Sequence, residues 1–185
     1  MASPFILQTE RLWLRPFARE DVEVLHRLWT DPDVRRYLWD DMIIERDRAA
    51  GEVEDSIASF RDKGFGMWVV LLAGATEVSG FAGFRLFGSP PTKKELMYGI
   101  APHLWGRGYA SEATRALLRF GFEKLDEECI YARTDPPNAA SMKVMEKAGM
   151  TFAGRQYEGD VELVTYVSEN PRRGTGYVPP AIQLD

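Results

Sequence analysis

The sequence contains little of the chemistry that metals and disulfides require. It has one cysteine, Cys129, and two histidines, His26 and His103, among 185 residues. One cysteine cannot form a disulfide within the chain, and three such residues are too few for a typical zinc site. Cys129 lies in an apolar, strand-like run, so we expect a buried thiol there and no metal site anywhere.

Long apolar runs are also missing. No run approaches the roughly 18 residues of a membrane helix. The N-terminal segment MASPFILQTE has no basic stretch followed by an apolar one, as a signal peptide would. The net charge of -5 argues against a general nucleic-acid binder and is weakly compatible with a cationic ligand. We therefore expect a cytoplasmic protein that binds neither membranes nor nucleic acids.

A glycine-rich turn, WGRGYA from Trp105 to Ala110, lies between a short apolar strand and an amphipathic helix. The first N–H groups of a helix have no intrahelical partners, and the helix dipole is positive there. Glycines let the backbone approach an anion, and Arg107 adds a charged donor. The arrangement predicts a phosphate site. The alternative is a helix start without a ligand.

Two common glycine loops fit this turn badly. A Walker loop requires Gly-Lys-Ser/Thr, which the sequence lacks. The dinucleotide fingerprint would require a glycine where Ser111 stands. A nucleotide-binding protein is therefore a disfavoured alternative.

The stretch WGRGYASEA, from Trp105 to Ala113, instead resembles the acyl-coenzyme A pyrophosphate loop of the GNAT superfamily of N-acyltransferases. The family pattern, Gln/Arg-x-x-Gly-x-Gly/Ala, is matched at Gly108 and Ala110. Trp105 takes the first position, as in the branch similar to the ribosomal-protein-alanine acetyltransferases (RimJ/RimL type). The opening segment Thr9-Glu10-Arg11-Leu12 resembles the same branch. The resemblance covers roughly residues 7–168.

A second signature, Asn138-x-x-Ser141 followed by Glu146-Lys147-x-Gly149, also resembles this family. By itself, Asn138 is also a good helix N-cap. The resemblance implies that Asn138 binds the pantetheine arm and that Ser141 lies near the thioester sulfur. The cofactor-binding residues that it implies are Ile100, Trp105, Gly106, Arg107, Gly108, Tyr109, Ala110, Ser111, Asn138 and Ser141.

The implied reaction transfers the acetyl group of acetyl-CoA to a primary amine. An alkyl ammonium, with a pKa near 10, must lose a proton before attack, and the thiolate leaving group must gain one. Ser141 is the expected acid. Glu95 is the first candidate base, because many family members carry theirs at a similar point of this strand. The open alternatives are a strand-edge Glu95 in water, a chain of waters, or one of the rivals Glu158, Asp160 and Glu162.

Tyr98 could contribute a hydroxyl to the site, although a strand tyrosine more often packs. Strand alternation places Tyr98 on the face opposite Glu95, unless a bulge changes the phase. The stretch from Val34 to Met42 is either a wall of the acceptor pocket or a self-packed connection. The pair Lys93-Lys94 could meet the 3′-phosphate of coenzyme A, but a solvated pair is the more ordinary interpretation.

The fold class that we predict is α+β. The GNAT resemblance implies a mixed, mostly antiparallel twisted sheet of about seven strands with helices on both faces. We expect strands over 11–17, 67–72, 78–87, 95–100, 130–133, 152–157 and 161–167. We expect helices over 18–29 and 44–61, a long helix after the turn that ends at Ala110, and a short helix from the N-cap Asn138 to Lys147. The predicted acetyltransferase domain is residues 1–169, followed by an extended tail over residues 170–185 that lies either on the body of the protein or on a neighbouring chain, where it could bridge two subunits of a homodimer.

The acceptor itself is not encoded in any motif that we recognise. A protein N-terminal α-amine and a small-molecule amine are both compatible with the resemblance. A different class also stays open, namely a catalytically silent acyl-CoA-binding or partner-binding module on the same fold.

Overall fold

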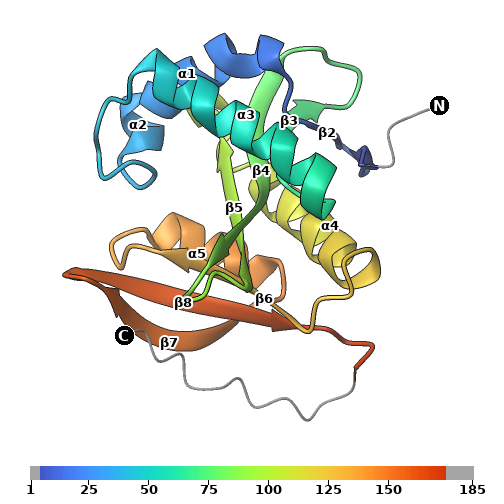
Figure 1. The fold of residues 1–185 in the computed structure, drawn as a ribbon, viewed down its shortest axis with the longest axis vertical. Coiled ribbons are helices and arrows are strands. Elements are labelled where there is room, and N and C mark those ends of the chain that lie inside the picture. The colour runs from blue at the N-terminus through green and yellow to red at the C-terminus, as the bar shows by residue number, and fades with distance from the viewer. Residues whose placement is uncertain (1–4, 174–185) are drawn as a thin grey trace.

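The computed structural model describes residues 5–173, which form one mixed sheet with helices on both faces (Figure 1). The strands are β1 (Leu7–Gln8), β2 (Leu12–Pro16), β3 (Met67–Leu72), β4 (Val78–Phe87), β5 (Lys93–Ile100), β6 (Cys129–Thr134), β7 (Thr151–Glu158) and β8 (Val161–Glu169). The helices are η1 (Arg19–Asp21), α1 (Val22–Thr30), α2 (Pro32–Arg35), α3 (Arg46–Lys63), η2 (Pro102–Leu104), α4 (Tyr109–Glu123) and α5 (Ala139–Lys147).

The sheet has eight strands in the order β1-β2-β3-β4-β5-β6-β8-β7. Neighbouring strands are antiparallel except for β5 and β6. The predicted α+β class, the mostly antiparallel sheet and the helices on both faces are confirmed. The strand beyond the expected seven is β1, a two-residue strand that pairs with β2.

Strand β3 shows why the sheet needs helices on both of its faces. Its central residues form a continuous apolar run, which is typical of a strand buried on both sides. Trp68 and Val70 belong to the core shared with α4, whereas Val69 and Leu71 belong to the core shared with α1 and α3. Strand β2 is buried on one face, because Leu12 and Leu14 are fully buried while Trp13 between them is exposed.

The sheet opens between β5 and β6. Their parallel pairing is recorded at one position, Glu95 opposite Tyr131. Beyond it β6 stays paired with β8, while β5 stays paired with β4 as far as Ile100. One backbone edge of β5 is therefore released beyond Glu95. This edge leads directly to the glycine-rich turn.

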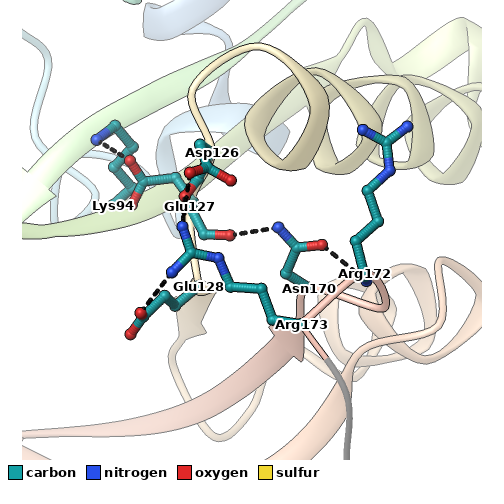
Figure 2. Close-up of polar contacts among 7 residues, drawn as sticks. All are labelled: Lys94, Asp126, Glu127, Glu128, Asn170, Arg172 and Arg173. Atoms are coloured by element: carbon teal, nitrogen blue, oxygen red, sulfur yellow. Dashed lines mark hydrogen bonds and ion pairs between the residues drawn. The ribbon is translucent and has the colours of Figure 1, made fainter.

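One segment differs from the sequence prediction, and the tail is described only in part. Residues 34–42 were expected to be irregular, but the short helix α2 ends at Arg35, and Asp31 caps it by accepting a bond from the Asp33 N–H. Asn170 to Arg173 return to the loop between α4 and β6 (Figure 2). The rest of the predicted tail, residues 174–185, lies outside the described residues.

Candidate active site

A cavity of about 410 Å³ lies beside the released edge of β5. Four parts of the chain surround it: α2 and the residues after it, β4 and β5, the glycine-rich turn with the start of α4, and α5. Figure 1 shows α2 and α5 on either side of β5. The cavity therefore joins the two predicted signatures, which are about 30 residues apart in the sequence.

Most of the predicted cofactor-binding residues line this cavity: Ile100, Trp105, Gly106, Gly108, Tyr109, Ala110, Ser111, Asn138 and Ser141. Arg107 is not among the lining residues. Its backbone carbonyl points to Arg11 on the β1–β2 side of the turn. Arg107 is thus part of the turn, but the structure does not bring it to the cavity.

The turn has the geometry of an anion cradle. Gly106 and Gly108 have φ angles of 76° and 81°, which only glycine adopts readily. Gly108 is the N-cap of α4, and no side chain caps the helix there. The first-turn N–H groups therefore keep their donors for a ligand, and the residues present fit a bound phosphate.

Strand β5 turns backbone groups toward the same cavity. The Ala101 N–H donates to the Ser79 carbonyl on the β4 side, at 2.9 Å. Alternation then directs the N–H and C=O groups of Ile100 and Tyr98 to the opposite, released edge. The indole N–H of Trp105 donates to the Ile100 carbonyl at 2.6 Å, which ties the turn to the end of the strand. The released N–H groups can bond a pantetheine amide or an acyl oxygen.

Tyr98 and Ser141 form a hydroxyl pair in the cavity. The two hydroxyl oxygens are 2.8 Å apart, and the Tyr98 hydroxyl also lies 3.0 Å from the Ser141 carbonyl oxygen, to which it donates. Burial raises the pKa of Tyr98 to about 12, against the smaller effect of the Ser141 hydrogen bond. Tyr98 is consequently a neutral phenol at physiological pH. The β4–β5 register runs without a shift, so Tyr98 lies on the face opposite Glu95, as alternation predicted.

Asn138 has both properties that the sequence suggested. Its side-chain oxygen accepts a hydrogen bond from the Ser141 N–H at 3.1 Å, so it caps α5. It also lines the cavity. The cap fixes the first turn of α5, and with it the position of Ser141.

Glu95 is not placed as a general base should be. Its carboxylate is buried on the far face of β5, between two guanidinium groups. Arg85 Nε lies 2.5 Å from Oε2, and Arg133 Nε lies 3.0 Å from Oε1. Glu95 does not line the cavity. The geometry therefore contradicts Glu95 as the base that meets the amine, because alternation turns its side chain away from the cavity and both oxygens are already paired.

The rival carboxylates lie elsewhere as well. Glu158 is paired with Arg133 at 3.0 Å, Glu162 with Arg155 at 2.9 Å, and Asp160 lies exposed in the turn between β7 and β8. None of them lines the cavity in the part of the chain that the structure describes. Among the described lining residues Asp33 is the one carboxylate, and it belongs to no motif that would have singled it out.

The α2 end of the cavity is mostly apolar. Val34, Tyr37, Leu38 and Phe81 line it together with Asp33. Residues 34–38 thus include a wall of the cavity, as one of the two interpretations held. Trp39 does not line the cavity and packs against Trp29, with ring centroids 6.1 Å apart.

Lysine side chains reach the site from α5. Lys143 and Lys147 line the cavity; Lys147 belongs to the second signature without a predicted binding role, and Lys143 was not predicted. Their i, i+4 spacing on the helix that carries Ser141 was the signal available. The pair Lys93-Lys94 lies elsewhere: Lys94 is paired with Glu127 at 2.5 Å, on the side of the sheet shown in Figure 2.

The family model of the acetyltransferase (GNAT) domain matches residues 11–151. The chain belongs to the GNAT acetyltransferase family. An uncharacterized N-acetyltransferase of Bacillus licheniformis, p20, is 31% identical over 158 residues, which are 82% of this chain and 86% of that protein. The matched residues include both the glycine-rich turn and the Asn138 signature.

Solved structures agree. An acetyltransferase from Agrobacterium tumefaciens has a TM-score of 0.79 at 27% identity and covers 91% of this chain and 96% of its own. RimL, a ribosomal L7/L12 α-N-protein acetyltransferase solved in complex with coenzyme A, has a TM-score of 0.75 at 19% identity, covering 89% and 97%. The RimL likeness shows a shared fold.

GNAT acetyltransferases transfer the acetyl group of acetyl-CoA to amines, and this chain is accordingly an acyl-CoA-dependent N-acetyltransferase. The catalytically silent alternative receives no support. None of the described helices is long and apolar enough to span a bilayer. Among the described residues no group of three or more His, Cys, Asp and Glu could hold a metal ion, and the absence of a metal stays a prediction.

Proposed function

We propose that the chain binds acetyl-CoA along β5, with the pyrophosphate at the glycine-rich turn and the thioester near Ser141, and acetylates a primary amine that enters from the α2 end of the cavity. The observation that carries this proposal is the Tyr98–Ser141 hydroxyl pair beside the released edge of β5. Acetyl-CoA supplies an activated acyl group. The other roles fall to groups of the chain and to water.

Three sets of donors support binding. The uncapped first turn of α4 offers N–H groups to the phosphates. Lys143 and Lys147 add positive charge on the opposite wall. The released N–H groups of Tyr98 and Ile100 offer bonds to the acyl and pantetheine region, where they stabilise charge that develops on the carbonyl oxygen.

Ser141 is the proposed acid for the departing thiolate. Its hydroxyl hydrogen-bonds to Tyr98, whose raised pKa keeps a proton on the phenol across the neutral range. Because Tyr98 donates its own proton to the Ser141 carbonyl, it holds the Ser141 hydroxyl in place, and water returns a proton to Ser141 after the transfer. Because no predicted carboxylate lines the cavity, we propose that water removes the proton from the ammonium group of the acceptor.

The acceptor is a primary amine, either a small molecule or a protein N-terminal α-amine. The apolar wall at the α2 end with Asp33 beside it suits the apolar body of a cationic amine. RimL acts on a ribosomal protein, but at 19% identity its acceptor is only a candidate here. A cytoplasmic reaction and a homodimer stay predictions.

The test has a binding arm and a turnover arm. Calorimetric titration should show binding of acetyl-CoA, with NAD and ATP as negative controls. Release of free CoA thiol should then be followed with a panel of peptides, polyamines and small amines. The matched variants are Ser141→Ala and Ser59→Ala, since Ser59 lies on α3 outside the cavity.

We expect Ser141→Ala to lower kcat by about 10²-fold, as the loss of a proton-transfer group does, with little change in acetyl-CoA affinity. Ser59→Ala should match the parent protein. Full activity of Ser141→Ala would remove Ser141 from the mechanism. No binding of acetyl-CoA would overturn the assignment of the turn.

A further inference from the structure

Two sequence signatures that lie about 100 residues apart meet on the outer side of the glycine-rich turn. Thr9 and Arg11 come from the tight connection between β1 and β2, and Glu112 lies in the first turn of α4. The Thr9 hydroxyl donates to Glu112 Oε1 at 2.6 Å, and the Arg11 backbone N–H donates to the same oxygen at 3.0 Å. Arg11 Nε donates to Glu112 Oε2 at 2.7 Å. One carboxylate thus collects three donors from the opening segment of the chain.

Arg11 also holds the turn itself. Its NH1 group donates to the Arg107 backbone carbonyl at 3.0 Å, and its guanidinium lies 4.8 Å from the centre of the Tyr109 ring. In a trans peptide the C=O of one residue and the N–H of the next point in opposite directions. Fixing the Arg107 carbonyl outward, toward Arg11, therefore turns the Gly108 N–H away from Arg11. Gly108 lines the cavity, so the N–H is held on the ligand side.

The same contacts neutralise the negative charge of Glu112. A carboxylate in the first turn of α4 would repel a phosphate bound there. Glu112 Oε2 instead lies 2.5 Å from the Arg11 NH2 group, and its side chain is only 11% exposed. Burial raises the pKa of Glu112, but the bonds from Thr9 and Arg11 and the Arg11 charge outweigh it, so the pKa lies below its ordinary value. Glu112 stays charged and paired at neutral pH.

We propose that Arg11, Thr9 and Glu112 are positioning residues that hold the glycine-rich turn in its anion-binding conformation from outside the cavity. None of the three lines the cavity among the described residues, so none is proposed to touch the ligand. The proposal rests on the proposed function, because it assumes that the turn binds the pyrophosphate of acetyl-CoA.

The variant Glu112→Ala distinguishes a positioning role from a purely electrostatic effect, because the two predict opposite changes in acetyl-CoA affinity. Glu112→Ala removes a negative charge next to the phosphate site. Charge alone predicts tighter binding of acetyl-CoA, whereas loss of positioning predicts weaker binding. Arg11→Gln removes a positive charge and the bond to the Arg107 carbonyl, so both views predict weaker binding for that variant.

The experiment measures kcat and the KM for each substrate, together with thermal unfolding, in the full chain. We expect Arg11→Gln and Glu112→Ala each to raise the KM for acetyl-CoA about tenfold or more, the range for a lost charged hydrogen bond. The KM for the amine and kcat should stay near the parent values. The double variant should be no worse than about the worse single variant, because the residues act through one contact.

Arg19→Gln is the matched control. It breaks an exposed arginine–glutamate pair, Arg19 Nε to Glu54 Oε1 at 2.5 Å, on η1 and α3. Its KM values should not change. Arg11→Lys keeps the charge but loses the planar fork, so its acetyl-CoA KM should fall between those of the parent protein and Arg11→Gln.

Tighter binding by Glu112→Ala, or an unchanged acetyl-CoA KM in Arg11→Gln, would overturn the positioning role. So would a lowered melting temperature in both variants with all kinetic constants intact, since that would mean a contribution to stability only. If the parent protein itself fails to bind acetyl-CoA, the proposed function has failed instead, and the two failures are distinguished.

Discussion

At the residue scale, Glu95 has a structural role, because its buried carboxylate pairs with Arg85 and Arg133. Arg133 is almost fully buried, with 2% of its side chain exposed, and its guanidinium depends on Glu95 for two hydrogen bonds. A buried charge that loses its partner is costly. The structural role and the role of base can therefore be separated by experiment.

We expect Glu95→Gln to destabilise the fold by about 3 kcal/mol, because the buried Arg133 then keeps only the exposed Glu158 as a countercharge. Urea unfolding measures this loss. The kcat of the folded fraction should stay near that of the parent protein. A large drop in kcat with unchanged stability would return Glu95 to the chemistry.

Tyr98 provides a pH prediction. Its pKa of about 12 in the folded chain exceeds the ordinary value near 10, so folding favours the protonated phenol. The resulting stabilisation is fully present below pH 10 and is lost as the pH rises from 10 toward 12. Difference spectra of the parent protein against Tyr98→Phe should show a phenol that ionises near pH 12. Ionisation near pH 10 would contradict a buried, hydrogen-bonded hydroxyl.

At the scale of the elements, the glycine-rich turn and α4 act together. Gly108 has a left-handed φ of 81°, and a side chain there would lie 3.6 Å from the Arg11 NH2 group. Replacement therefore strains the backbone, while the added Cβ itself meets the Arg11 NH2 group at an ordinary contact distance. Gly149, just after α5, has a comparable φ of 91° and open space around it.

We expect Gly108→Val to weaken acetyl-CoA binding by more than about tenfold and to cost about 1–2 kcal/mol of stability through backbone strain. Gly149→Val should carry a similar strain with little effect on affinity. Calorimetric titration and thermal unfolding of both variants compare the two effects. Equal affinities would show that Gly108 serves the helix start and not the ligand.

At the scale of the whole molecule, the segment after β8 is fastened to the loop between α4 and β6 (Figure 2). The Asn170 side chain donates to the Glu127 carbonyl at 2.8 Å and accepts from the Arg172 N–H at 3.0 Å. Arg173 reaches Asp126 and Glu128, both at 2.6 Å. These contacts involve none of the residues that line the cavity.

We expect Asn170→Ala to destabilise the fold by about 1–3 kcal/mol, because it leaves the Glu127 carbonyl without the donor that Asn170 supplies. Asn170 is itself 4% exposed. Arg173→Gln should cost less, because its ion pairs are exposed to solvent. Denaturant midpoints measure both effects, and the KM values should not change. A changed acetyl-CoA KM would mean that this segment communicates with the cavity.

The sequence by itself determined the elements and the family. Alternation placed Tyr98 opposite Glu95. The glycine turn and the Asn138 cap were found because local backbone chemistry requires those residues at those positions, and Ser141 was found through the family resemblance. These signals are local, so they can be read without knowing the fold. The predicted bounds of β3 and β4 agree with the structure for the same reason.

Only the tertiary structure decided what faces the cavity. Three examples are the pairing of Glu95 with Arg85 and Arg133, the presence of Asp33 and Lys143 in the cavity lining, and the contact between Arg11 and Glu112. Each brings together residues from different elements. Such contacts depend on how the sheet opens between β5 and β6 and on which helices cover each face. No residue spacing along the sequence records that geometry, because side-chain partners are set by packing in three dimensions.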